Sequence, residues 1–210
     1  MKRETLVRLA VGTVLMLGLF LNGCGGTSRS AKFYTLSPVQ STGMTGKQAP
    51  LSDTTSVTIG VGPVEIPDYL DRQQIVTRSA QNEIEVSEFD RWAGSLRDDV
   101  SRVLVENLSI LLPPDKKVSV VPWNHGGPFQ YRMAVHVARF DVTPGESVWL
   151  KARWTIFDRD GRTVVLSQES NLREPLNARD YPTMVAVMAK ALGTFSRELA
   201  DGINVALSAK

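Results

Sequence analysis

The chain has 210 residues, of which 24 are Lys or Arg and 22 are Asp or Glu. This balance of charge argues against a nucleic-acid-binding protein, because such proteins need a basic excess on one face. The single cysteine excludes an internal disulfide bond.

Residues 1–23 have the pattern of a signal peptide. A basic region is followed by an apolar run over residues 9–21, and the run ends in Leu21-Asn22-Gly23-Cys24. The run is shorter than the roughly 20 residues of a transmembrane helix, and the Ala-x-Ala-like site of an ordinary secretory signal is absent. The Leu-x-Gly-Cys pattern resembles the lipobox of bacterial lipoproteins, in which a diacylglyceryl group is attached to the thiol.

Cys24 is therefore the predicted lipid attachment site, with a covalent diacylglycerol or other acyl lipid such as palmitate and no further cofactor. Gly25 follows it, whereas an aspartate at this position commonly retains enterobacterial lipoproteins at the inner membrane. We therefore expect the outer membrane rather than the inner one, with the protein facing the periplasm. Removal of residues 1–23 leaves 21 basic and 21 acidic residues, so the mature chain is close to neutral.

The mature chain is expected to form a lipidated tether and one domain. Residues 24–32 are mostly small and polar, which predicts the tether. Residues 33–210 are the predicted single domain, which opens with a short strand at 33–36. Residues 37–56 are rich in Ser, Thr, Gly, Gln and Pro and are predicted to form a flexible loop.

Three strands are predicted after this loop. The first spans 57–66, and Pro63 within it implies an edge position or a bulge. A turn at 67–72 then leads to a hairpin with strands at 74–78 and 83–87.

A long helix is predicted from 89 to 112. Apolar residues recur there at intervals of three and four, and Ser87 with Asp90 gives a weak capping-box signal in front. Two prolines, Pro113 and Pro114, end the helix. The apolar stripe consists of Trp92, Leu96, Val100, Val103, Leu104, Leu108 and Leu111.

Four further strands and a second helix complete the domain. The strands are predicted at 118–123, 130–142, 148–157 and 162–170, with a hairpin turn at 158–161. The helix is predicted at 181–207, with Asp180 as its N-cap. The expected fold class is α+β, with a mainly antiparallel or mixed β-sheet and two long amphipathic helices packed on it.

Two aromatic residues of the strand at 148–157 leave an alternative open. If the alternating apolar residues of this strand face the core, Trp149 and Phe157 point to the opposite side of the sheet. We expect them to pack under a helix in a two-sided sheet. The alternative is a contact patch for a partner or for lipid.

No catalytic or metal site can be assembled from the sequence, so an enzyme is not expected. The two histidines are isolated, with His125 in a Gly-rich loop and His136 in the middle of a strand. Zinc-hydrolase and α/β-hydrolase motifs are absent. Asp158 and Asp160 resemble part of a calcium loop, but no glutamate stands at the closing position, which favours a hairpin turn.

A distinctive motif covers residues 59–78 and contains Gly60-Val61-Gly62-Pro63, Pro67-Asp68-Tyr69-Leu70-Asp71-Arg72 and Ile75-Val76-Thr77-Arg78. Together with Phe33-Tyr34-Thr35-Leu36 and Arg91-Trp92-Ala93, this motif resembles the ABC-type transport auxiliary lipoproteins, a PqiC-like family. The resemblance extends over nearly the whole mature chain. One departure is Gln73, where many relatives are expected to have proline.

The resemblance implies a non-catalytic docking component at the outer-membrane end of a transport system. Such systems are built around MCE-domain proteins, often with an ABC permease and ATPase. They move phospholipid or other hydrophobic molecules between the inner and outer membranes. The implied partners are therefore the MCE-domain protein with its permease and ATPase, and the membrane through the lipid anchor; a homo-oligomeric ring would suit this role.

Two other classes of function remain as alternatives. The first is a lipoprotein accessory of another envelope assembly or secretion machine. The second, a periplasmic hydrolase, is disfavoured because no nucleophile–base pair is recognisable.

The candidate partner-contact residues lie in the turn at 67–72 and just after it. They are Pro67, Tyr69, Leu70, Arg72 and Arg78. The alternative is that these residues only set a turn and fill the core.

Overall fold

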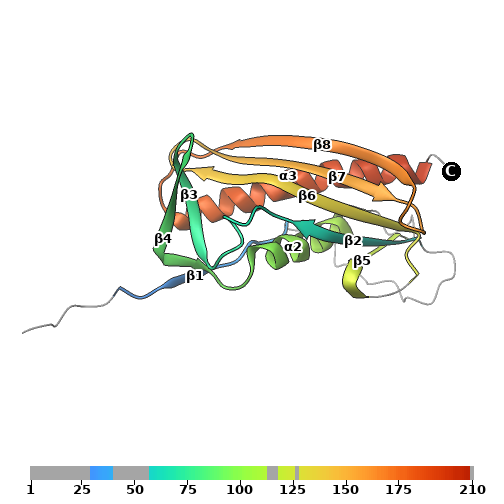
Figure 1. Ribbon diagram of the computed structural model, residues 1–210, viewed down its shortest axis with the longest axis horizontal. Helices are drawn as coiled ribbons and strands as arrows, with labels where there is room; N and C mark the ends of the chain where they lie inside the picture. Colours follow the sequence, from blue (N-terminus) through green and yellow to red (C-terminus); the bar gives the residue numbers. More distant parts are fainter. Residues whose placement is uncertain (1–28, 40–56, 113–117, 126–127, 209–210) are drawn as a thin grey trace, which may run out of the picture. The chain divides into compact units, whose positions relative to one another are not determined.

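The computed structural model describes residues 29–39, 57–112, 118–125 and 128–208. Its helices and strands belong to residues Ala31–Lys210, which form a compact unit (Figure 1). The predicted signal peptide, the attachment residue Cys24 and most of the predicted loop at 37–56 lie outside the described residues.

The described elements follow the predicted order of strands and helices. In chain order they are β1 (Lys32–Tyr34), β2 (Val57–Glu65), β3 (Gln74–Ala80), β4 (Glu83–Trp92), α2 (Leu96–Leu111), β5 (Val118–Pro122), the 3₁₀-helix η3 (Trp123–His125), β6 (Tyr131–Thr143), β7 (Ser147–Phe157), β8 (Val164–Pro175) and α3 (Tyr181–Ser208). Strand β1 includes Lys32, which was assigned to the tether in the sequence-based prediction.

The strands form two mixed sheets. The smaller sheet has the order β1-β4-β3, and the larger has the order β5-β2-β6-β7-β8. In the larger sheet β2 pairs in parallel with both β5 and β6, whereas β6, β7 and β8 are antiparallel. The predicted α+β class with a mixed sheet is confirmed, and the division into two sheets is a feature that the prediction did not contain.

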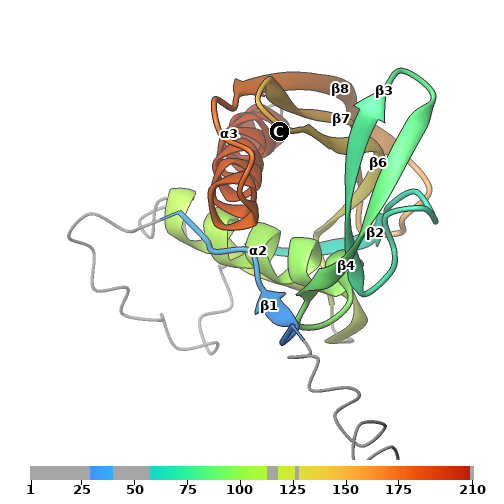
Figure 2. The ribbon, with the colours of Figure 1, turned by 90° about the vertical axis from the view of Figure 1, so that its left-hand side faces the viewer.

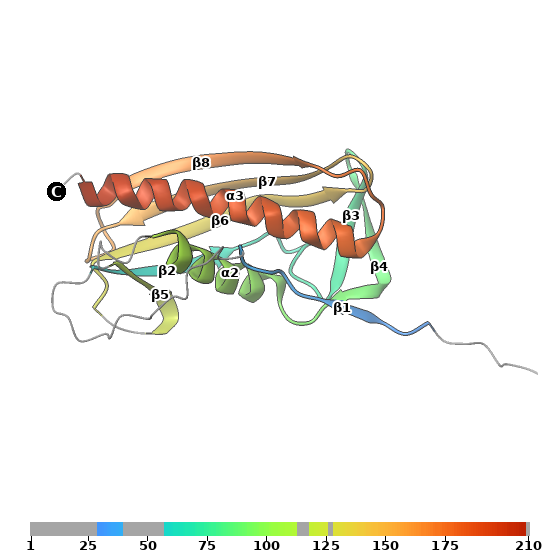
Figure 3. The ribbon, with the colours of Figure 1, turned by 180° about the vertical axis from the view of Figure 1, so that it is seen from behind.

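Both helices lie on the same side of the larger sheet (Figures 2 and 3). Strand β7 alternates as predicted, because Leu150, Trp154 and Ile156 are each 1% exposed while their neighbours in the strand are partly or fully exposed. The buried residues of β7 and its neighbouring strands pack against α2 and α3. The hydrophobic core therefore lies between the sheet and the two helices.

Helix α3 confirms the second predicted helix. Its N-cap is Asp180, whose carboxylate accepts hydrogen bonds from the Thr183 backbone N–H and the Thr183 hydroxyl, both at 2.9 Å. These hydrogen bonds to the charged form hold the pKa of Asp180 below its ordinary value. Among the described residues, no helix combines the length and apolarity needed to cross a membrane.

The first helix was predicted at 89–112, but in the structure it begins later, at Leu96. Residues 89–92 belong to strand β4, where Trp92 pairs with Tyr34 of β1 and donates its backbone N–H to the Gln73 carbonyl at 2.6 Å. The Ser87 hydroxyl does accept from the Asp90 N–H at 2.9 Å, but within the strand. Helix α2 starts at Leu96, and its actual N-cap is Ser95.

A bulge accounts for Pro63 in strand β2. This strand lies between β5 and β6, so it is not at an edge, and its register with β6 shifts between Val61 and Val64. Gly62 adopts φ +130°, a conformation that favours glycine, and a Cβ there would lie 2.7 Å from Cδ1 of Trp123. Of the two predicted explanations for Pro63, the bulge is the correct one.

The predicted hairpin turn at 158–161 is confirmed between β7 and β8. The Gly161 N–H donates to the Asp158 carbonyl at 3.0 Å, and Gly161 has φ +67°. The Asp158 carboxylate accepts from the Arg162 and Thr163 N–H groups, both at 3.3 Å. Hydrogen bonding, chiefly from Thr163, lowers the pKa of Asp158.

Candidate functional site

The motif turn at 67–72 is a compact, hydrogen-bonded structure between β2 and β3. The Leu70 N–H donates to the Pro67 carbonyl at 2.9 Å, and the Arg72 N–H donates to the Leu70 carbonyl at 2.9 Å. The Leu70 side chain is 3% exposed and belongs to the core, whereas Arg72 is exposed. Of the five predicted contact residues, Leu70 is therefore inaccessible and Arg72 is accessible.

Two other predicted contact residues meet at one carboxylate. The Tyr69 hydroxyl donates to Asp141 Oδ1 at 2.6 Å, and Arg78 Nε donates to Asp141 Oδ2 at 3.0 Å. Arg139 Nη1 also donates to Asp141 Oδ2, at 3.2 Å. Asp141 is only 5% exposed, so these partners compensate a buried charge and join the motif to strand β6.

Sequence reasoning did not identify Asp141 as part of this cluster. A signal was nevertheless present, because Asp141 stands between the apolar residues Phe140 and Val142 in strand β6. The register with β7 shifts between Val137 and Arg139, and this shift turns Asp141 toward the side of the sheet away from the helices, opposite Trp149. A carboxylate within an apolar strand requires a cationic or hydrogen-bonding partner.

Tyr69 acts as a hydrogen-bond donor in this cluster. Burial, the hydrogen bond to Asp141 and the negative charge of Asp141 raise the pKa of Tyr69 to about 12. The phenol therefore stays protonated throughout the neutral range. Its role is structural and positional, because it cannot exchange a proton with a substrate near pH 7.

Trp149 continues this cluster along the sheet. The guanidinium groups of Arg139 and Arg173 lie 4.4 and 3.9 Å from the centroid of its ring. The indole Nε1–H donates to Asn171 Oδ1 at 2.7 Å. Phe157, at the other end of β7, lies under the Arg132 guanidinium at 5.2 Å.

The prediction that Trp149 and Phe157 pack under a helix is wrong. Both helices lie on the opposite side of the sheet (Figure 2), and arginine side chains cover the two rings instead. Stacking on guanidinium groups keeps aromatic surface partly covered without a helix above it. The alternative of a contact patch is compatible with this arrangement.

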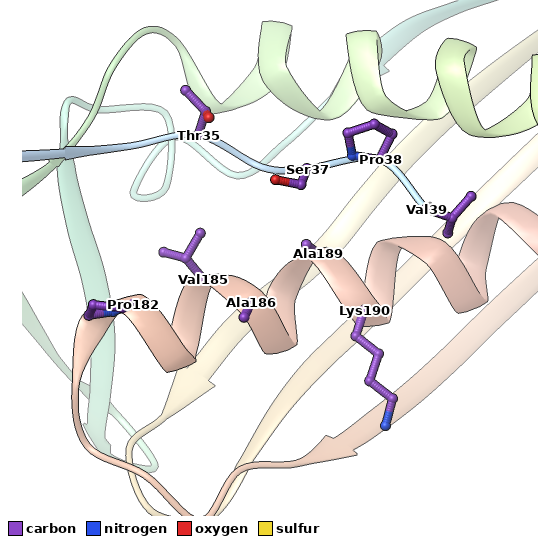
Figure 4. A pocket seen from close by; sticks show the side chains of 9 residues that line it. All are labelled: Thr35, Ser37, Pro38, Val39, Pro182, Val185, Ala186, Ala189 and Lys190. Carbon is purple, nitrogen blue, oxygen red and sulfur yellow. The ribbon is translucent and has the colours of Figure 1, made fainter. Parts of the chain in front are cut away.

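A second candidate surface is a groove beside helix α3. Residues 35–39, which we call the strap, run alongside α3, and Figure 4 shows the side chains of both segments around the groove. The groove has a volume of about 380 Å³. Most of its lining is aliphatic, and Lys190 at its rim is paired with Glu174 at 2.8 Å.

The strap is fixed to helix α2 by its backbone. The Leu36 N–H donates to Asp99 Oδ2 at 2.5 Å, and Arg102 Nη2 donates to the Leu36 carbonyl at 2.8 Å. The Val39 N–H donates to Asn107 Oδ1 at 2.8 Å. Val39, within the predicted loop at 37–56, is therefore hydrogen-bonded to the domain.

Comparison with known proteins identifies the family. The family model of the ABC-type transport auxiliary lipoprotein component matches residues 34–200. The chain belongs to this family. The match includes the motif turn, the Asp141 cluster, all of α2 and α3 as far as residue 200, and it confirms the resemblance inferred from the motif.

Curated and solved relatives agree with this assignment. The auxiliary lipoprotein is 27% identical over 188 residues to the intermembrane transport lipoprotein PqiC of Escherichia coli K12, with 90% of this chain and 92% of PqiC covered. The crystal structure of a Xanthomonas campestris protein superposes with a TM-score of 0.67 at 17% identity, covering 85% of this chain and 97% of that one. A crystal structure of an uncharacterized protein has a TM-score of 0.68 at 20% identity, covering 83% and 99%. The two structures establish the shared fold.

The two histidines of the auxiliary lipoprotein lie in different elements of the structure. His136 is exposed on strand β6, with Nδ1 3.1 Å from Glu65 Oε2. His125 lies in η3, and its side chain is outside the described region. Within the described ranges, no three His, Cys, Asp or Glu side chains are grouped to hold a metal ion.

Proposed function

We propose that this auxiliary lipoprotein is a non-catalytic docking component of an MCE-type system that transports lipid between the two membranes. The observation that carries the proposal is the family match over residues 34–200. It is supported by 27% identity to PqiC, a relative named for intermembrane transport, over 90% of the chain. The MCE-domain protein and its permease and ATPase are the proposed partners.

The structure supports a binding role over a chemical one. Tyr69 and Arg78 are both engaged by Asp141, so neither is available as an acid or base for a substrate. The same side of the sheet carries Trp149 between two arginines. Tryptophan and arginine are the residues most enriched at the energetic centres of protein interfaces.

The proposed attachment to the outer membrane is through an acyl lipid on Cys24. Lys32, the first residue of β1, is eight positions after Cys24. An extended chain spans at most ~3.5 Å per residue, so the start of β1 would stay within roughly 28 Å of the membrane surface. Because two or more acyl chains are needed for stable anchoring, the lipid would be at least diacylated.

Co-purification from crosslinked envelopes tests this function. The full-length lipoprotein, carrying a C-terminal affinity tag, should recover an MCE-domain protein together with permease or ATPase subunits. A Cys24→Ala variant produced at the same level is the matched control. This variant is not lipidated, so much less of these partners should co-purify with it. Repeated recovery of neither an MCE-domain protein nor a transporter subunit by the unmodified protein would contradict the proposal.

A further inference from the structure

One side of the larger sheet is not covered by either helix. We call it the outer face. It is formed by the side chains of β2, β6, β7 and β8 that alternate with the buried, helix-facing residues of these strands. Figure 1 views the sheet from this side, and strand β3 packs against one end of it, at β6. The register places Asp141, Trp149 and Arg173 in one row across three strands. A second row at the other end of β7 contains Arg132 and Phe157.

The outer face is more basic than the chain as a whole. On these strands it carries five cationic side chains, from Arg132, Arg139, Lys151, Arg153 and Arg173. The same side of these strands carries three carboxylates, from Glu65, Asp141 and Glu169. The mature chain is close to neutral, so this excess is a local property of the surface.

Two of these arginines have no ion-pair partner among the described residues. Arg132 and Arg173 form no salt bridge there, whereas Lys151 and Arg153 share Glu169 at 2.9 and 3.6 Å. The Nε atom of Arg132 is buried without a hydrogen-bond partner. The outer face therefore presents guanidinium groups whose charge is not neutralised by a neighbouring carboxylate.

Aromatic rings hold these guanidinium groups in place. Arg132 lies between Trp123 and Phe157, at 5.6 and 5.2 Å from the ring centroids. Trp123 can lie against β2 because Gly62 has no side chain. Arg173 lies 3.9 Å from the centroid of Trp149. Stacked guanidinium groups lose less conformational entropy on binding than free ones, and their edges remain able to pair with carboxylates.

This composition favours a protein as the occupant over a membrane surface. A membrane-binding face inserts several uncovered aromatic rings between lipids, but here the rings of Trp149 and Phe157 are covered by arginines. Trp123, which is 42% exposed, is the most open of the three rings. Ordered Trp and Arg side chains are instead typical of the energetic centre of a protein interface. The excess of positive charge selects a partner segment rich in Asp and Glu.

We propose that the outer face is a docking surface for an acidic segment of a partner protein, with Arg132, Arg153 and Arg173 as the charged contacts. This proposal rests on the proposed function, because it gives the docking component its contact surface. Carboxylates of the partner pair with the stacked guanidinium groups of Arg132 and Arg173, and the surrounding rings exclude water from these pairs. Arg153, whose side chain is 69% exposed and lies 3.6 Å from Glu169, adds a charged contact between them.

Photocrosslinking in the full-length, membrane-anchored protein tests the surface. In one variant benzoylphenylalanine replaces Thr155, at the centre of the outer face. In the control variant it replaces Val205, which is 60% exposed on α3. We expect a crosslink from position 155 to a protein, with the attached peptide rich in Asp and Glu, and none from position 205. The same crosslink should weaken as salt is added.

Charge reversal provides the second measurement. In the position-155 background, Arg153→Glu with Arg173→Glu should lower the crosslink yield roughly tenfold or more, since repulsion replaces attraction. Arg197→Glu, the same change on an exposed residue of α3, should leave the yield unchanged. Arg173→Lys keeps the positive charge but loses the planar stacking on Trp149, so it should give an intermediate loss of crosslink yield. Because this substitution is conservative, its result holds even if the double variant misfolds.

The possible results separate this proposal from the proposed function. A crosslink from position 205 alone, a yield insensitive to charge reversal, or attachment only to phospholipid or to a second copy of the chain overturns the docking surface. If an MCE-domain protein co-purifies but position 155 does not crosslink to it, the surface fails and the function stands. If position 155 crosslinks in a charge-dependent way to an acidic segment of a protein outside any transporter, the surface stands and the function fails.

Discussion

The Asp141 carboxylate joins segments that are distant in sequence. It accepts hydrogen bonds from Tyr69 in the motif turn, Arg78 in β3 and Arg139 in its own strand. Replacing it with a neutral group leaves two guanidinium groups without their counter-charge. At the scale of single residues, the Asp141 carboxylate therefore provides the hydrogen bonds that join Tyr69 and Arg78 of the motif to the larger sheet.

We predict that Asp141→Asn lowers the free energy of unfolding by about 2–3 kcal/mol. The loss is smaller than for a fully buried pair because Arg139 is 38% exposed and can be hydrated. Urea unfolding followed by circular dichroism measures the change. Glu169→Gln, at an exposed carboxylate that also bridges two cations, is the matched control and should leave the midpoint nearly unchanged. Equal effects of the two substitutions would contradict a special role for Asp141.

Tyr69 should make stability depend on pH on the alkaline side. Burial and the hydrogen bond to Asp141 raise its pKa from 10.0 to about 12 in the folded chain. Between these two values the unfolded chain loses the phenolic proton first, so unfolding is favoured. The contribution of Tyr69 is therefore complete below pH 10 and is lost as pH rises toward 12.

Urea midpoints measured between pH 8 and 12 test this expectation. The decline above pH 10 should be shallower in Tyr69→Phe than in the unmodified chain. It should not disappear, because burial and the hydrogen bond to Asp90 also raise the pKa of Tyr34 to about 12. Identical slopes in the two proteins would show that Tyr69 ionises alike in the folded and unfolded states.

At the scale of helices and strands, regular hydrophobic patterns were sufficient for most of the fold. The alternation of β7 and the apolar stripe of α3 predict both elements and their buried faces. The start of α2 was not predictable in this way, because Phe89, Trp92 and Leu96 have helical spacing although the first two belong to β4. Residues 90–92 form a strand because their backbone pairs with β1 and β3. The sequence around residues 90–92 does not reveal this pairing, because the partner strands are distant in sequence.

The candidate site was predicted less completely for the same reason. The motif drew attention to Tyr69 and Arg78, but their shared partner Asp141 is more than 60 residues away in sequence. The stacking of Arg132 on Phe157 depends on the register between β6 and β7. Register across a sheet is set by all of the strands together, so a single-sequence pattern does not reveal it.

Helix α3 packs closely against the sheet at Gly202. A Cβ at this position would overlap Cη2 of Trp154, a side chain that is 1% exposed and whose indole N–H donates to the Ser170 hydroxyl at 3.1 Å. We predict that Gly202→Ala costs about 1–2 kcal/mol of unfolding free energy, because overpacking outweighs the better helix propensity of alanine. Gly94→Ala is the control, since a Cβ there meets no atom within 4 Å. Thermal unfolding of both variants measures the difference, and a Gly202→Ala protein as stable as its parent would contradict close packing.

At the scale of the whole molecule, the chain combines near-neutral net charge with a separation of charge. The outer face carries unpaired arginines, whereas the exposed part of strand β4 carries Glu83, Glu85 and Glu88. The net charge of the chain is therefore near zero although separate parts of its surface carry opposite charges. An acidic partner is attracted to the arginines and repelled by the glutamates of β4, and this gives orientation as well as attraction.

The location of the whole molecule should depend on the residue after the lipidated cysteine. We predict that Gly25→Asp moves the protein from its proposed location at the outer membrane to the inner membrane, because an aspartate in this position commonly retains lipoproteins there. Ser28→Asp introduces the same charge three residues later and should leave the protein at the outer membrane. Separation of the two membranes on a density gradient, followed by immunodetection, measures the distribution.

This change leaves residues 33–210 intact, so it separates location from folding. The Gly25→Asp protein should unfold at the same temperature as its parent, yet it should fail to replace the parent in cells. Its tether reaches only ~3.5 Å per residue, which is far too short for the domain to act at the opposite membrane. If Gly25→Asp still fractionates with the outer membrane, Gly25 does not direct sorting. If it moves to the inner membrane and still replaces the parent, the domain does not have to be held at the outer membrane, and the proposed docking position is wrong.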